Sequence, residues 1–498
     1  MICTLFVILA VLATCISAFD YKTNLGYGLQ RLKAAKKGRL TTGTTCDNIP
    51  ELWFKDAVVD NFAPVEKQVK WAGNGQRYWT NKEFWGGAGF PIFVFIGGEG
   101  QESCSRLTNR MYVYQLAQEH KALLVDVEHR FYGQSYPTDD MSTDNLQYLS
   151  SSQALADLAR IIPYIKNSLN TENSRVVTVG GSYPGNLAAW FRLKYPSVSH
   201  GSIASSAPVT AKVNFFEYME VVADAMKYYR GQVCYDAFES AAESVAKLAS
   251  QGFGSDGMKK LEKDFVTCST INNELDLAIL MSDLMGNVQG TAQYNNEHNG
   301  VLNMTDICDI MTANPSDPYG QFVQLAGKFR ASSGLECEDA NYNDVISYLA
   351  DPTKDPNNNG RPWIYQTCNE FGYYQTTDST KQPFSSWKPL NLDFSRKMCF
   401  DMFNGWKSDP EVAWINNEYG NVHIEGTNII FPSGTIDPWH ALGVTNSTPA
   451  LEQPSEQPLY ILGTAHCNDL YAPSNSDPDS LVFARSVVAD TVAKWLKK

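Results

Sequence analysis

The 498-residue sequence has few basic residues, with 40 lysines and arginines against 54 aspartates and glutamates and a formal net charge of −14. This excess of acid argues against nucleic acid as a partner, because phosphate binding needs basic patches. The sequence also lacks an internal repeat and any low-complexity tract. Hydrophobic residues make up 43% and aromatic residues 12%, which is enough for a large core and excludes intrinsic disorder.

Long apolar runs are missing as well. The N-terminus has a short apolar core at residues 5–13, followed by the small residues Ser17 and Ala18. This pattern predicts a secretory signal peptide at residues 1–18, because about 20 apolar residues are needed to cross a bilayer. We therefore expect no membrane anchor, and a protein that is secreted or lysosomal.

The sequence contains no C-x-x-C pair, which disfavours a zinc site or a thioredoxin-like site. Eleven cysteines are present, and nine remain once Cys3 and Cys15 leave with the signal peptide. An odd number leaves at least one thiol unpaired among Cys46, Cys104 and Cys467 if the other six form bonds with each other. The sequons at Asn303 and Asn446 predict glycosylation, which also requires the secretory route.

The most informative motif is the stretch Gly180-Gly181-Ser182-Tyr183-Pro184-Gly185. A β-branched run at residues 175–179 predicts a buried strand before it, and residues 186–195 predict a helix after it. A serine between a strand and a helix indicates the nucleophile elbow of an α/β-hydrolase. The alternative is a glycine-rich loop in which Ser182 only caps the helix. Pro184 replaces the usual glycine but is tolerated in a first helical turn.

Strands and helices alternate on both sides of this motif. The pattern predicts an α/β-hydrolase fold, with a parallel sheet covered by helices on both faces. The expected strands are residues 91–96, 122–127, 175–179, 201–205, 428–431 and 459–462, and the expected helices outside the insertion are 153–169, 186–195 and 481–496.

The alternation is interrupted by an insertion at residues 212–399. Runs at residues 235–249 and 274–285 predict helices, and six of the nine remaining cysteines lie in this segment. We interpret it as a large, mostly helical, disulfide-bonded cap. The predicted organisation is therefore a signal peptide at 1–18, a hydrolase domain in two parts at 19–211 and 400–498, and the cap at 212–399.

A nucleophilic serine needs a base and an orienting carboxylate, and in α/β-hydrolases these follow in the order Ser, Asp or Glu, His. Asp437 follows the predicted strand 428–431, and His466 follows the last predicted strand. We predict the triad Ser182, Asp437 and His466. His440 is the rival base, but it shares a loop with Asp437.

The oxyanion of an acyl-transfer intermediate needs two backbone donors. The N–H of Tyr183 is the expected first donor, because it follows the nucleophile. The glycine-rich loop after strand 91–96 offers a second donor, for which we choose Gly98, although this loop could also be a simple turn. The mechanism needs no cofactor and no metal, and none is expected.

The sequence resembles the serine exopeptidase family that contains prolyl carboxypeptidase, a lysosomal dipeptidyl peptidase and thymus-specific serine protease, with the thymus-specific branch most similar. The resemblance rests on blocks in one order along nearly the whole mature chain: 76–79, 97–100, 128–133, 180–190, 204–209, 365–370, 437–439 and the loop of His466. It implies the same triad, the helical cap and the pairs Cys234–Cys308, Cys268–Cys337 and Cys368–Cys399.

The resemblance also implies cleavage next to proline, for which Trp439 is a candidate pocket wall. The alternative for Trp439 is a structural tryptophan packed under the cap. Cys467 stands where prolyl carboxypeptidase has a second histidine, which makes similar pH behaviour doubtful. We predict a carboxypeptidase or dipeptidyl peptidase acting on short peptides. A lipase or esterase on the same fold and a catalytically silent binding protein are the alternatives, and a homodimer stays open.

Overall fold

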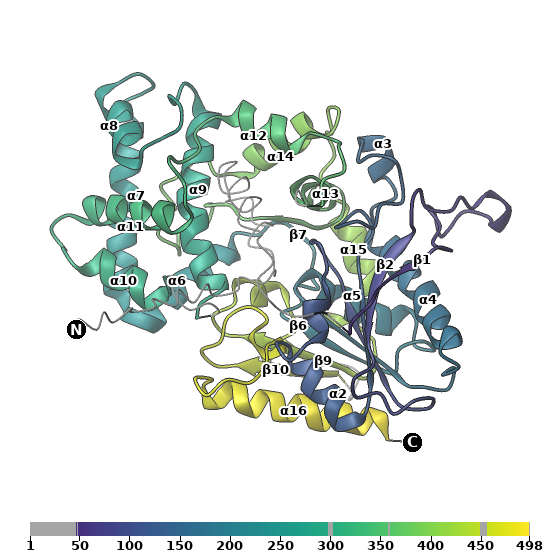
Figure 1. Ribbon diagram of the computed structural model, residues 1–498. Helices are drawn as coiled ribbons and strands as arrows, with labels where there is room; N and C mark the ends of the chain where they lie inside the picture. The colour runs from purple at the N-terminus through teal and green to yellow at the C-terminus, as the bar shows by residue number, and fades with distance from the viewer. Residues whose placement is uncertain (1–45, 47, 297–301, 357–358, 449–455, 498) are drawn as a thin grey trace, which may run out of the picture.

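The computed structural model describes residues 46, 48–296, 302–356, 359–448 and 456–497 of the chain (Figure 1). The signal peptide predicted at residues 1–18 lies outside the described residues. Among the described helices, none has both the length and the apolar character of a membrane-spanning segment.

An eight-stranded sheet forms the centre of the molecule, in the order β1-β2-β4-β3-β5-β6-β9-β10. The strands from β4 to β10 in this order are parallel, whereas β1 and β2 are antiparallel to their neighbours. This order and its antiparallel start define the α/β-hydrolase fold. The strands are β1 (Glu51–Phe54), β2 (Gln76–Asn81), β3 (Ile92–Ile96), β4 (Leu123–Val127), β5 (Val176–Gly181), β6 (Gly201–Ser205), β9 (Ile429–Gly434) and β10 (Glu456–Ile461).

The expectation of a wholly parallel sheet is therefore wrong at one edge. Strand β2 is buried along its whole length although it contains Gln, Arg, Thr and Asn. Its Arg77 is neutralised by Glu128, with Nη2 2.5 Å from Oε1 and Nε 3.1 Å from Oε2. Because an ion pair accommodates the buried Arg77 and the strand has several other polar side chains, hydrophobic periodicity does not reveal it.

Helices cover both faces of the sheet, as predicted. In β3, Ile92, Val94 and Ile96 pack on the face covered by α4 (Ser151–Ser168) and α5 (Tyr183–Lys194). Phe93 and Phe95 point to the other face, which is covered by α2 (Tyr112–His120) and α16 (Asp479–Leu496). This alternation is the period of two that a pleated strand imposes, and both faces are apolar because both are buried.

A mostly helical cap lies between β6 and β9, above the sheet in Figure 1. It contains one small parallel pair, β7 (Lys212–Asn214) and β8 (Gly372–Tyr374). The helices from β6 to β9 are α6 (Glu217–Arg230), α7 (Gln232–Ala249), α8 (Asp256–Phe265), α9 (Glu274–Gln293), α10 (Met304–Thr312), α11 (Pro318–Ser332), α12 (Tyr342–Leu349), α13 (Gly360–Gln366), α14 (Leu392–Met402) and α15 (Val412–Tyr419). The short α3 (Thr143–Leu146) precedes α4.

Three disulfides hold the cap together, and their pairs are those that the resemblance implies: Cys234–Cys308, Cys268–Cys337 and Cys368–Cys399. Each closes a loop of tens of residues, which corresponds to about 3–4 kcal/mol in the chain-entropy model. Cys46 pairs with Cys104 outside the cap. Cys467 is buried and unpaired, so it is the odd cysteine that the count requires.

Candidate active site

Ser182 lies at the corner between β5 and α5, with φ 65° and ψ −133°. A non-glycine residue with such dihedral angles is strained, and strain of this kind concentrates at functional sites. The N–H of Ser182 donates to the carbonyl of Ser205 at 3.0 Å, which fixes the corner against β6. A Cβ atom at Gly180 would overlap the backbone of Pro184, so the tight turn requires glycine there. The helix begins at Tyr183, three residues before its predicted start.

Asp437 and His466 meet above the carboxyl ends of β9 and β10. Nδ1 of His466 lies 2.8 Å from Oδ1 of Asp437, and both side chains are buried. The same Asp437 oxygen accepts the N–H of Trp439 at 3.0 Å. The backbone N–H of His466 donates to the carbonyl of Gln293 on α9 at 2.9 Å. The carboxylate and the imidazole are therefore held in place from the sheet and from the cap.

The residues next to Ser182 and His466 in the sequence pack against each other. A Cβ atom at Gly181 would lie 2.8 Å from the sulfur of Cys467, so these two residues pack directly against each other. The Cys467 N–H also donates to Oγ of Ser206 at 2.9 Å. His466 Nε2 is buried and has no hydrogen-bond partner among the described residues, the Ser182 hydroxyl included. Hydrogen bonds between a catalytic base and its nucleophile are often long before substrate binds.

The protonation of the two candidate bases differs. Burial disfavours the charged form of His466, but the adjacent Asp437 carboxylate outweighs it, and the pKa of His466 is raised well above 6.5. Burial instead lowers the pKa of His440. His440 Nε2 lies 3.0 Å from the hydroxyl of Tyr460. The structure thus pairs Asp437 with His466, and His440 with Tyr460.

The two proposed oxyanion donors lie on either side of Pro184. Tyr183 is the first residue of α5, where backbone N–H groups have no intrahelical acceptor and attract negative charge. A Cβ atom at Gly98 would overlap the ring of Pro184, which shows that the loop after β3 touches the elbow. Burial raises the pKa of Glu102, and a hydrogen bond from the Gly98 backbone is among the contacts that oppose this shift. The structure therefore places this loop at the elbow, but the backbone N–H of Gly98 is hydrogen-bonded to Glu102.

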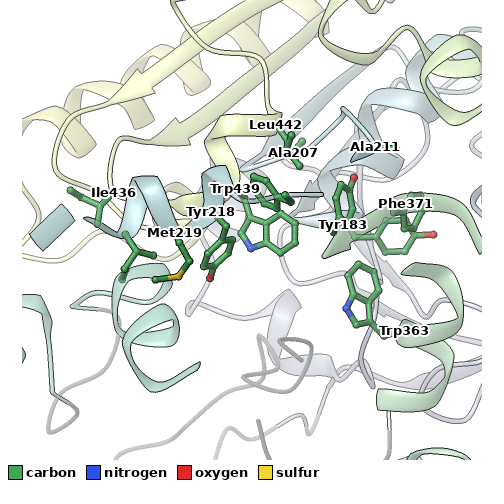
Figure 2. Packing of buried hydrophobic residues seen from close by; sticks show 14 of the residues in the cluster. Tyr183, Ala207, Ala211, Tyr218, Met219, Trp363, Phe371, Ile436, Trp439 and Leu442 are labelled. Atoms are coloured by element: carbon green, nitrogen blue, oxygen red, sulfur yellow. The ribbon is translucent and has the colours of Figure 1, made fainter. Parts of the chain in front are cut away.

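Trp439 packs under the cap, as its structural interpretation expects, and its role as a pocket wall stays a prediction. Its side chain is buried beneath the cap, and Nε1 donates to Oε1 of Gln293 at 3.1 Å. Its ring lies 5.7 Å from that of Tyr218, and Figure 2 shows Tyr183 and Trp363 on the other side of Trp439. The ring centroid is also only 6.4 Å from that of His466.

A pocket opens beside Trp439, between α9, α13, β8 and α14. Aromatic and apolar side chains form most of its wall, with polar groups among them: Met285, Trp363, Tyr373, Leu390, Phe394, Trp439, Ser282, Gln289, Thr367, Gln375, Asn391 and Ser395. Tyr373 connects this wall to the elbow, because its hydroxyl and the Asn186 side chain both donate to the carbonyl of Pro208. The arrangement fits a flat, rigid, apolar group with a few polar contacts.

Several residues of the site carry no sequence signal. Gln293 accepts hydrogen bonds from Tyr218 and Trp439 through its side chain and from His466 through its carbonyl. It lies beyond residue 285, where the predicted helix ends.

Of the two sequons, Asn446 is exposed, while Asn303 caps α10 and its side chain accepts the N–H of Asp306 at 2.9 Å. Glycosylation stays a prediction at both.

A strained serine elbow and a buried histidine–aspartate pair on this sheet define a serine hydrolase of the α/β-hydrolase fold. The profile of the family described as serine carboxypeptidase S28 matches residues 57–488, so the chain belongs to this family of serine peptidases.

The relatives agree with this assignment. The Caenorhabditis elegans protein F56F10.1, whose name classes it with the serine proteases, is 35% identical over 96% of this chain and 89% of its own. Thymus-specific serine protease of Mus musculus is 32% identical over 85% of this chain and 84% of its own. Lysosomal Pro-X carboxypeptidase of Mus musculus is 28% identical over 84% of this chain and 85% of its own.

Proposed function

We propose that this serine peptidase is a secreted or lysosomal exopeptidase that hydrolyses short peptides next to proline. The observation that carries the proposal is the buried His466–Asp437 pair behind the Ser182 elbow, with an aromatic pocket at its side. The four disulfides fit an oxidising compartment. The name of the lysosomal Pro-X carboxypeptidase supports both the compartment and the preference for proline.

In the proposed reaction, Ser182 Oγ attacks the scissile carbonyl while His466 Nε2 takes its proton. Asp437 holds the imidazole through Nδ1 and stabilises the imidazolium. The Tyr183 N–H and an amide of the loop around Gly98 stabilise the oxyanion. His466 then protonates the leaving amine, and water hydrolyses the acyl-enzyme by the same steps in reverse order.

The cap accounts for the proposed preference for short peptides. Helix α9 contacts the site directly, because the carbonyl of Gln293 accepts the His466 N–H and its side chain accepts from Trp439. A folded protein chain would have to pass these cap contacts to reach Ser182. Proline has a rigid ring that loses little conformational entropy on binding, which suits a pocket walled by Trp363, Tyr373 and Trp439.

The test uses the secreted, disulfide-bonded protein, a fluorophosphonate probe and a peptide library varied at every position. We expect the probe to label wild-type protein and not Ser182→Ala, and peptides with proline beside the cut to be preferred. Ser244→Ala is the control, because Ser244 is a half-buried serine on the cap helix α7, and its hydroxyl donates to the Ser240 carbonyl of the same helix. Mass spectrometry of the products shows which end is trimmed.

The other interpretations give different results in the same assay. Turnover of esters without peptides would make the protein an esterase, and an unlabelled wild type would make it a catalytically silent binding protein. If Trp439→Ala leaves the preference for proline unchanged, the proposed pocket is wrong.

A further inference from the structure

Residues 128–133 and 365–370 are two of the sequence blocks that contribute no residue to the triad. In the structure they meet at one atom, the hydroxyl of Tyr183. His129 Nε2 lies 3.0 Å from this oxygen, and Gln366 Nε2 donates to it at 3.0 Å. Tyr132 in turn donates to Oε1 of Gln366 at 2.6 Å. All four side chains are buried.

The directions of these hydrogen bonds follow from the acceptors. His129 Nδ1 lies 2.7 Å from the carbonyl of Arg130, which can only accept, so Nδ1 carries the proton and Nε2 is an acceptor. Burial lowers the pKa of His129 to about 3, so the ring is neutral. The chain therefore runs from Tyr132 to Gln366, from Gln366 to Tyr183, and from Tyr183 to His129. Every member has a partner.

The ring of Tyr183 is fixed as firmly as its hydroxyl. Its centroid lies 5.5 Å from His129, 5.9 Å from Trp363 and 5.3 Å from Phe371. Figure 2 shows Tyr183 next to Phe371 and Trp363. Trp363, Gln366 and Phe371 belong to α13 and the π-helical turn Thr367–Phe371, so the cap surrounds this side chain.

The cap segment is itself anchored to the hydrolase domain. Burial raises the pKa of Glu370 to about 7, and a hydrogen bond from the Gln366 side chain is among the contacts that oppose this shift. Glu370 also accepts the N–H and the hydroxyl of Ser151, at the start of α4. The disulfide Cys368–Cys399 ties the same turn to α14. Gln366 thus joins the cap, the sheet domain and the residue after the nucleophile.

We propose that Gln366 is a positioning residue that holds the Tyr183 N–H in line with the oxyanion. The inference rests on the proposed function, in which Ser182 is the nucleophile and the Tyr183 amide is an oxyanion donor. Tyr183 has no free rotation while both ends of its side chain are held. Without the Gln366 bond its backbone can move, and a donor displaced by part of an ångström loses most of its effect in the transition state.

This role predicts an effect on kcat rather than on KM. The oxyanion develops only as the reaction approaches its transition state, and Gln366 itself is not among the residues that line the proposed pocket. For Gln366→Met we expect kcat to fall about 10- to 100-fold with KM changed less than threefold. Tyr183→Phe, which removes the hydroxyl at the other end of the same bond, should do the same.

Tyr374→Phe is the matched control. Tyr374 also has a buried hydroxyl in the cap, 3.4 Å from the carbonyl of Thr367, but it is outside the Tyr183 chain. We expect wild-type kcat for this variant. The thermal midpoint of each variant is measured as well, because a merely structural bond would lower it without changing kcat.

The closing experiment measures the rate constant of fluorophosphonate labelling at Ser182 alongside peptide turnover. Slower labelling in Gln366→Met than in Tyr374→Phe supports the proposal. Equal labelling in the two variants, or a change in KM alone, overturns it. If wild type is labelled but cleaves no peptide, the proposed function fails, and the labelling rates still decide the role of Gln366. If Tyr183→Phe does not fold, Gln366→Met decides alone.

Discussion

Asp437 directs one oxygen at two partners, His466 Nδ1 and the N–H of Trp439. In Asp437→Asn the amide can accept the same contacts but carries no charge to stabilise the imidazolium, and it can turn its NH₂ group toward the ring. We expect kcat to fall about 10⁴-fold. Steady-state kinetics check this, with Asp309→Asn as an exposed control that keeps wild-type kcat.

The state of His466 sets the pH dependence of the reaction. The base must be neutral to accept the proton from Ser182, and the Asp437 carboxylate raises the pKa of His466 above 6.5 in spite of burial. Activity therefore rises with pH as His466 deprotonates, and it is lost toward pH 5. A profile of kcat/KM from pH 5 to 9 checks the sign. A plateau that extends down to pH 5 would contradict the assignment of His466 as the base.

At the scale of elements, the loop after β3 and the first turn of α5 fit each other through Gly98 and Pro184. A Cβ atom at Gly98 would overlap the Cγ and Cδ atoms of the proline ring, whereas the Pro184 Cβ lies at an ordinary contact distance of 3.7 Å. We expect Gly98→Ala to lower kcat at least tenfold, since displacing an oxyanion donor typically costs about 10- to 1000-fold.

Pro184→Ala removes the overlapping ring atoms and keeps the Cβ atom. We therefore expect the double variant Gly98→Ala with Pro184→Ala to recover most of the lost activity, while Pro184→Ala alone stays close to wild type. A double variant as inactive as Gly98→Ala would show that the glycine is needed for a reason other than its fit against Pro184.

The sequence predicts best those strands and helices whose apolar residues follow one uniform pattern along the whole element. Strand β6 begins and ends where expected, and β3 and β4 each begin one residue later. Helix α9 is predicted only to residue 285, but it continues to Gln293. Its last turns contain Asn287, Gln289 and Gln293, which are buried as part of the site. These side chains are polar although they are buried, so hydrophobic periodicity cannot detect this end of the helix.

At the scale of the whole molecule, the pairing of Asp437 with His466 could be predicted because each of the two residues follows a strand of the sheet. The contacts between cap and sheet could not be predicted, because they join residues far apart in sequence. The bond between Gln366 and Tyr183 spans 183 positions, and the bond between Trp439 and Gln293 spans 146. Only the folded chain determines such pairs.

Stability should depend on pH through buried carboxyl groups. Burial raises the pKa of Glu370 from 4.5 to about 7 and that of Asp469 from 3.8 to about 6. The folded state thus prefers their neutral forms, and this contribution is complete below the unfolded pKa values and lost as pH rises through 6 and 7. His129 acts in the opposite direction, because its pKa of about 3 lies below 6.5 and its contribution is lost in acid.

We expect the thermal midpoint to fall between pH 5 and pH 8, and Glu370→Gln to make this decrease smaller. The amide removes the titration while its oxygen can still accept from Ser151. Thermal unfolding at several pH values checks this expectation. An unchanged pH dependence in Glu370→Gln would show that Glu370 is already ionised in the folded protein at neutral pH.

The position of the cap in the chain has a consequence for biosynthesis. Ser182 precedes the insertion, whereas Asp437 and His466 follow it, and β9 pairs with β6 across 227 positions, at Ser202 and Ile429. A ribosome that has made the nucleophile elbow must still complete the whole cap before the aspartate and the histidine emerge. A nascent chain therefore carries no assembled site, and the peptidase first becomes competent when translation is nearly finished, after most of its cysteines have been added to the chain.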